Sequence, residues 1–129
     1  DDYIERLQIA RYPPSGGYVE AHRDPPNIMT CIISGYLSKK GVDYQEGGFF
    51  SHDEKHGKLD AEKYIDAGDV GFFYSSLIHG VDPIDTKGTA DIDKKDGRWW
   101  FGLNMHNSNT TDKVVTRISG APYNFKAKN

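Results

Sequence analysis

Glycine and proline interrupt this sequence at short intervals, and the runs between them resemble strands more than helices. The chain contains 14 Gly and 6 Pro, together with 8 Tyr, 6 Phe and 2 Trp. Aromatic and β-branched side chains fit the pleated surface of a sheet, and glycine is tolerated in tight turns. The expected strands cover residues 7–12, 18–22, 28–37, 47–51, 64–66, 70–75, 79–84, 98–105 and 114–119. Short strands separated by turn signals predict an all-β sandwich or jelly roll.

The size and charge of the chain exclude several classes of protein. A length of 129 residues suits a single domain with one hydrophobic core. The net charge of -3 gives no general attraction to nucleic acid. No apolar run approaches the roughly 20 residues needed to cross a bilayer, and no signal peptide opens the chain. We therefore expect neither a nucleic-acid partner nor a membrane partner, and the oligomeric state stays open.

The single cysteine, Cys31, allows no disulfide within the chain. This favours a reducing compartment and a cytoplasmic location. Cys31 lies in the most apolar stretch, residues 28–37, so we interpret it as a core thiol rather than a reactive one.

A His-x-Asp sequence follows the second expected strand. Side chains two apart on a strand share a face, so His22 and Asp24 can point the same way. His79 and Arg98 each open a later expected strand. Two histidines and one carboxylate are typical of non-haem Fe(II) oxygenases, and an inward Arg can bind a carboxylate through two parallel hydrogen bonds. A His-x-Asp pair alone is common by chance, and it is the order of all four residues that favours an iron site.

Several short motifs share an order along the chain. They are residues 10–13 (Ala-Arg-Tyr-Pro), 17–19 (Gly-Tyr-Val), 22–24 (His-Arg-Asp), 30–32 (Thr-Cys-Ile), 36–37 (Tyr-Leu), 47–49 (Gly-Gly-Phe), 68–69 (Gly-Asp), 72–73 (Phe-Phe), 79 (His) and 97–99 (Gly-Arg-Trp). In this order, over residues 7–105, the sequence resembles the catalytic core of Fe(II)- and 2-oxoglutarate-dependent dioxygenases, specifically their prolyl-4-hydroxylase-like branch. The resemblance implies a double-stranded β-helix, a cupin-like jelly roll, with residues 1–129 forming a single catalytic domain. Relatives usually carry helices outside the barrel and the first residue is Asp, so we expect a piece of a longer protein.

The resemblance also implies a cofactor set and a reaction. His22, Asp24 and His79 are expected to hold Fe(II), and Arg98 is expected to bind the far carboxylate of 2-oxoglutarate. With O2, the reaction would release succinate and CO2 and hydroxylate a small molecule or a peptide or amino-acid side chain. Ascorbate is a candidate reductant. The carboxylate at residue 24 favours hydroxylation, or another oxidation such as desaturation, because related halogenases lack it.

Three further residues are implied in the cosubstrate pocket. Tyr12 matches a tyrosine that lines this pocket in relatives. A residue of the third expected strand often helps to bind the far carboxylate, and the register leaves Ser34 and Tyr36 as alternatives. The loop before Arg98 is longer than the corresponding loop in relatives of this family.

Strand parity suggests where the substrate would bind. Counting by twos from Arg98 places Trp100 and Asn104 on the inward face, and counting back from His22 places Glu20 there. Trp100 stands where many relatives have a small polar residue. Asn104 is the preferred candidate for a substrate contact.

Two other functions are compatible with the same strand pattern. One is a cupin-like barrel that binds a ligand or acts as an isomerase, although cupins usually carry two closely spaced His followed by a Glu and a later His. The other is a regulatory module that kept the fold and lost activity, which an intact triad argues against. His52 and His56 are four apart, but their charged surroundings favour a solvated loop over a zinc pair.

Overall fold

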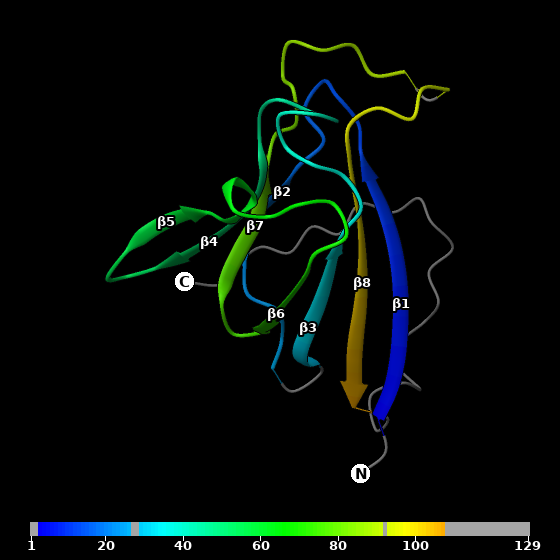
Figure 1. Cartoon of the computed structure of the whole chain (residues 1–129). Helices are drawn as coiled ribbons and strands as arrows, with labels where there is room; N and C mark the ends of the chain where they lie inside the picture. The colour runs from blue at the N-terminus through cyan, green and yellow to red at the C-terminus, as the bar shows by residue number, and fades with distance from the viewer. Residues whose placement is uncertain (1–2, 27–28, 92, 108–129) are drawn as a thin grey trace.

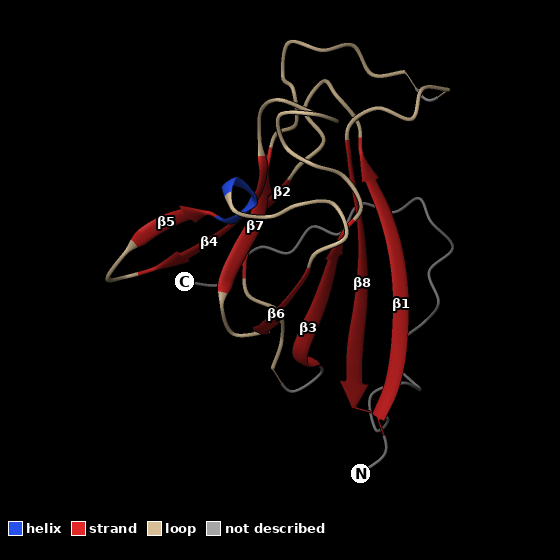
Figure 2. Cartoon of the chain, in the orientation of Figure 1, coloured by secondary structure: helices blue, strands red, loops and turns tan. Residues whose placement is uncertain are grey.

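Two antiparallel four-stranded sheets make up the computed structural model, which describes residues 3–26, 29–91 and 93–107 (Figures 1 and 2). The strands are β1 (Tyr3–Tyr12), β2 (Val19–His22), β3 (Met29–Tyr36), β4 (Gly48–Asp53), β5 (Gly57–Asp60), β6 (Val70–Tyr74), β7 (Ile78–Asp82) and β8 (Arg98–Asn107). A 3-10 turn, η1 (Ala61–Lys63), follows β5. The sheet orders are β1-β8-β3-β6 and β2-β7-β4-β5. The predicted all-β jelly roll is confirmed.

The long pair β1 and β8 fixes which side chains face the interior. Tyr12 lies opposite Arg98, and Arg6 lies opposite Asn104. Directly opposed residues of an antiparallel pair project on the same side, so this register brings polar side chains of both strands to one face. The side chains between them, such as Leu7 and Ile9, are exposed on the other face.

The outer face of the first sheet is unusually apolar. Leu7 and Ile9 on β1 and Phe72 and Tyr74 on β6 are all exposed large hydrophobic residues. These four side chains leave apolar surface uncovered on this face of the sheet. A buried cluster of Tyr44, Val81 and Ile84, with Tyr12 and Val19 packed against it, forms a hydrophobic core.

Two local predictions were wrong. Residues 64–66 form no strand, because the chain leaves η1 through turn bonds: the Tyr64 N–H donates to the Ala61 carbonyl and the Asp66 N–H to Asp69 Oδ2. Residues 52–62, for which we expected no strand, instead contain β5, which forms a hairpin with β4. The expected strand at residues 114–119 lies outside the described residues.

The carboxylate of Asp53 explains the unexpected hairpin. It accepts the N–H groups of Lys55 and His56, and Gly57 takes a φ of +71° that favours glycine. The turn is charged and has no hydrophobic pattern, so the pattern of apolar residues does not predict these hydrogen bonds. In the described part of the chain, no helix has the length and apolar character needed to span a membrane.

Ile84 offers a direct test of the core. Its side chain is 0% exposed, so Ile84→Ala should lower the free energy of unfolding by about 2–4 kcal/mol, measured by urea denaturation. Ile9→Ala is the matched control because Ile9 is 62% exposed, and its change should stay within about 0.5 kcal/mol. Equal losses in the two variants would contradict this packing.

Candidate metal centre and cavity

The pairing of β2 with β7 brings together residues that are distant in the sequence. His22 lies directly opposite His79 in this pair, and Asp24 follows β2. The Asp24 carboxylate reaches both imidazoles, with 3.6 Å from its Oδ1 to His22 Nε2 and 3.3 Å from its Oδ2 to His79 Nε2. One ligand atom from each of the three residues lies within 4.8 Å of the others. The three side chains can therefore hold a metal ion.

Backbone carbonyls orient both imidazole rings. His22 Nδ1 lies 2.8 Å from the Glu20 carbonyl oxygen, and His79 Nδ1 lies 2.9 Å from the Leu77 carbonyl oxygen. When Nδ1 donates to a carbonyl, Nε2 keeps its lone pair, and this is the usual state of a metal-binding histidine. Both Nε2 atoms face Asp24, so the cluster is arranged as a ligand set.

Asp24 is in the protonation state that a metal ligand needs, whereas at His22 a metal ion would compete with a proton. Burial acts to raise the pKa of Asp24, but hydrogen bonds from His22 and His79 outweigh it and hold the pKa well below the usual range. The same hydrogen bond to Asp24 raises the pKa of His22, against the opposing effect of burial. Asp24 is thus ionised at neutral pH. Two imidazole nitrogens and one carboxylate on one side of a metal fit the facial triad of non-haem Fe(II).

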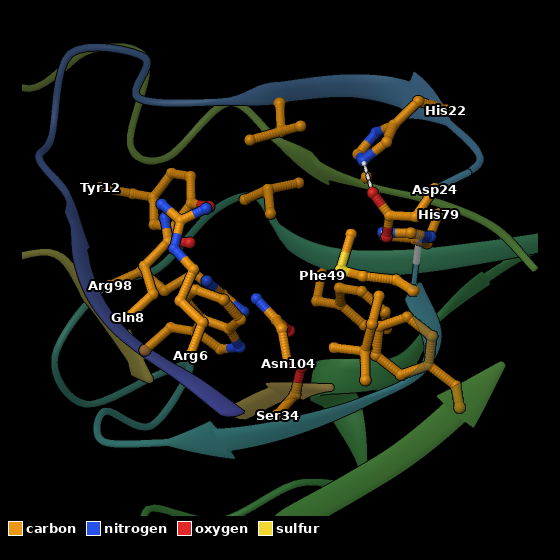
Figure 3. A pocket seen from close by; sticks show the side chains of 17 residues that line it. Arg6, Gln8, Tyr12, His22, Asp24, Ser34, Phe49, His79, Arg98 and Asn104 are labelled. Carbon is orange, nitrogen blue, oxygen red and sulfur yellow. Dashed lines mark ion pairs between the residues drawn. The ribbon is translucent and has the colours of Figure 1, made fainter. Parts of the chain in front are cut away.

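A cavity of about 230 Å³ extends from this cluster between the two sheets. It is lined by side chains of both sheets, including Phe49 and Val81 from one and Ser34 and Asn104 from the other. Figure 3 shows His22, Asp24 and His79 at one end and Arg98 beside Tyr12 at the other. The cavity therefore connects a metal-binding end to a cationic end.

Arg98 is almost completely buried at the far end. Its exposed fraction is 2%, and its Cζ atom lies 5.0 Å from the ring centroid of Tyr12 and 5.8 Å from that of Tyr36. Burial raises the pKa of Tyr12, and burial together with the charge of Glu62 raises the pKa of Tyr36 to about 12. Both phenols stay protonated near neutral pH, so each can donate a hydrogen bond.

Glu62 is the residue that the sequence analysis missed. Its Oε1 accepts a hydrogen bond from Arg98 Nε at 2.6 Å and forms an ion pair with Arg98 Nη2, also at 2.6 Å. Its Oε2 accepts a hydrogen bond from the Tyr44 hydroxyl. The residue is 5% exposed and lies in η1. It sits in a charged stretch that reads as a solvated loop, and no sequence signal distinguishes it from its exposed neighbours.

The structure places the remaining candidates as follows. Ser34 lines the cavity and Tyr36 packs against Arg98, so both alternatives on β3 lie on the same face. Trp100 and Asn104 also line the cavity, and the buried Asn104 Oδ1 has no hydrogen-bond partner among the described residues. The inward placement of Glu20 is wrong. The register shifts between Val19 and His22, which breaks the alternation, and Glu20 is exposed.

His52 and His56 form no metal cluster with other described residues. Both are exposed, and His56 Nδ1 lies 3.0 Å from Asp53 Oδ2 within the hairpin turn. Both side chains are solvated as expected, but the loop interpretation is wrong for His52, which lies in β4, and only His56 lies in the turn. Within the described residues, the group of His, Cys, Asp or Glu side chains close enough to hold a metal is His22, Asp24 and His79.

Fold and cluster together define a jelly-roll protein with a site that can hold a metal through two histidines and a carboxylate. Comparison of the sequence with protein-family models and with curated proteins gives no match. Among solved structures, the chain is similar to a prolyl hydroxylase from Trichoplax adhaerens in complex with a hypoxia inducible factor oxygen degradation domain peptide fragment. The TM-score is 0.60 at 16% sequence identity, over 89% of this chain and 49% of that chain.

This likeness supports the fold, and the chain spans about half the length of the prolyl hydroxylase chain. At such low identity the similarity does not transfer an activity. The prolyl-4-hydroxylase-like branch therefore stays a prediction.

Proposed function

We propose that this chain is the catalytic core of an Fe(II)- and 2-oxoglutarate-dependent dioxygenase. The observation that carries the proposal is the convergence of His22, Asp24 and His79 at one end of a cavity whose other end holds Arg98. A metal-chelating keto acid with a second carboxylate needs these two features at two ends of one site. The residues described here would form most of that catalytic domain, and a cytoplasmic location stays a prediction.

The chain's own residues would perform the binding and orienting steps. Bound Fe(II), together with 2-oxoglutarate and O2, would supply the oxidation that releases succinate and CO2. Arg98 would receive the far carboxylate of 2-oxoglutarate, with protonated Tyr12 and Tyr36 beside it as hydrogen-bond donors. Phe49 and Phe73 provide apolar walls near the metal ligands, and such walls exclude water from a reacting centre.

The substrate would be a small molecule or a peptide or amino-acid side chain. Asn104 supports a substrate that offers a hydrogen-bond donor, because the residue lines the cavity and its buried Oδ1 lacks a partner among the described residues. An amide N–H or a hydroxyl would satisfy it, whereas 2-oxoglutarate carries only acceptors. The solved prolyl hydroxylase binds a peptide, which makes a peptide a reasonable first substrate to test.

Calorimetry with Mn(II) as a stand-in for Fe(II) tests the proposal. We expect 2-oxoglutarate to bind the metal-loaded protein with a micromolar Kd, and not to bind without metal. We also expect succinate from 2-oxoglutarate in the presence of Fe(II), O2 and ascorbate. Metal binding with no 2-oxoglutarate binding would contradict the proposal and favour a cupin-like barrel.

A further inference from the structure

The guanidinium of Arg98 has two sides with different neighbours. Its Nε donates a hydrogen bond to Glu62 Oε1, and its Nη2 forms an ion pair with the same oxygen. Its Nη1 has no hydrogen-bond partner among the described residues. Arg98 lines the cavity, whereas Glu62 does not. The Glu62 carboxylate therefore binds Arg98 from behind and leaves the cavity side of the guanidinium available.

The fold provides a dedicated place for this carboxylate. Glu62 Oε2 accepts a hydrogen bond from the hydroxyl of Tyr44. The Tyr44 side chain is 2% exposed. Gly48 has a φ of +110°, and a Cβ there would lie 2.4 Å from Glu62 Oε2. A side chain at residue 48 would thus compete with Glu62 for space. The Arg98–Glu62 pair is a built feature of the interior, and not a chance contact at the surface.

We infer that Glu62 is a positioning residue that fixes the Arg98 guanidinium and at the same time weakens its attraction for the far carboxylate of 2-oxoglutarate. The inference rests on the proposed function. Two carboxylates that share one buried guanidinium repel each other, and this repulsion is strong where water is scarce. Glu62 therefore lowers the affinity for 2-oxoglutarate. In the free protein it also gives Arg98 a counter-charge.

Glu62→Gln tests the inference because an amide keeps the shape and removes the charge. Its oxygen can still accept from Arg98, and its nitrogen can donate to the Tyr44 oxygen. We expect 2-oxoglutarate to bind the Mn(II)-loaded variant about tenfold more tightly than it binds the native chain. The unliganded variant should unfold at a lower temperature, because Arg98 has lost its counter-charge.

The control ligand is 2-oxopentanoate, in which a methyl group replaces the far carboxylate. Its Kd should be the same for Glu62→Gln and the native chain, because the changed charge acts only on the far carboxylate. An equal or weaker 2-oxoglutarate affinity in the variant would overturn the inference. So would an equal gain for both keto acids, which would place the effect at the metal.

Tyr44→Phe supplies a second test with the opposite sign, should Glu62→Gln fail to fold. Without the tyrosine hydroxyl, no hydrogen bond offsets the negative charge on Glu62 Oε2, so Glu62 repels the far carboxylate more strongly. We therefore expect 2-oxoglutarate to bind about two- to threefold more weakly. Unchanged or tighter binding would contradict the inference. If the native chain binds neither keto acid with Mn(II), the proposed function fails. If it binds both with equal affinity, Arg98 does not hold the far carboxylate: the inference fails, and of the proposed function only metal-dependent keto-acid binding remains.

Discussion

Replacing Asp24 with alanine is expected to lower metal affinity by more than about 100-fold and to remove 2-oxoglutarate turnover. Asp24 is the member of the cluster that contacts both histidines, at 3.6 Å and 3.3 Å. The variant loses one of three ligands and also the negative charge that balances the metal. Mn(II) calorimetry measures the affinity, and succinate formation with Fe(II) measures the turnover.

Asp82→Ala is the matched control for this result. Asp82 is also a carboxylate, it ends β7, and it pairs with Lys58 outside the cavity. Its metal affinity and succinate formation should equal those of the native chain. Full succinate production by the double variant Asp24→Ala, His79→Ala would rule out the proposed metal centre.

Replacing Arg98 with methionine is expected to damage both binding and stability. The Kd for 2-oxoglutarate should rise by more than about 100-fold, because the far carboxylate loses a charge-assisted, two-bonded partner. The free energy of unfolding should fall by about 3 kcal/mol, because Glu62 would be left as a buried carboxylate without its cation. Calorimetry with Mn(II) and denaturant unfolding measure the two effects separately.

The double variant Arg98→Met, Glu62→Gln separates the two roles of Arg98. Removing the second charge relieves the buried anion, so much of the lost unfolding free energy should return. Binding of 2-oxoglutarate should not return, because no cation faces the cavity. Recovery of binding in the double variant would show that Arg98 acts only through the fold.

The candidate metal ligands could be proposed from the sequence because His22, Asp24, His79 and Arg98 follow one another in a set order. The β2–β7 pairing then places the two histidines opposite each other. Parity along β8 correctly placed Trp100 and Asn104 on the cavity side. That strand runs without a break in its pairing with β1, so alternation holds along its whole length.

Parity failed where the backbone is irregular. The register shift between Val19 and His22 turns Glu20 to solvent, and no residue type in that stretch predicts a bulge. Glu62 was not predictable for a different reason. Its role depends on Arg98 and Tyr44, which reach it from other parts of the chain. A local pattern contains no information on such a partner.

The unbroken β8 strand also limits how this protein can diverge. Arg98 lies at its start and Asn104 near its end, so the strand fixes the distance between them at about 3.3 Å for each residue. Inserting or deleting one residue between them would send every later side chain to the opposite face. Hairpin tips such as residues 54–56 can therefore vary in length, whereas a change in length within β8 would move Arg98 and Asn104, the proposed cosubstrate and substrate contacts, to opposite faces of the sheet.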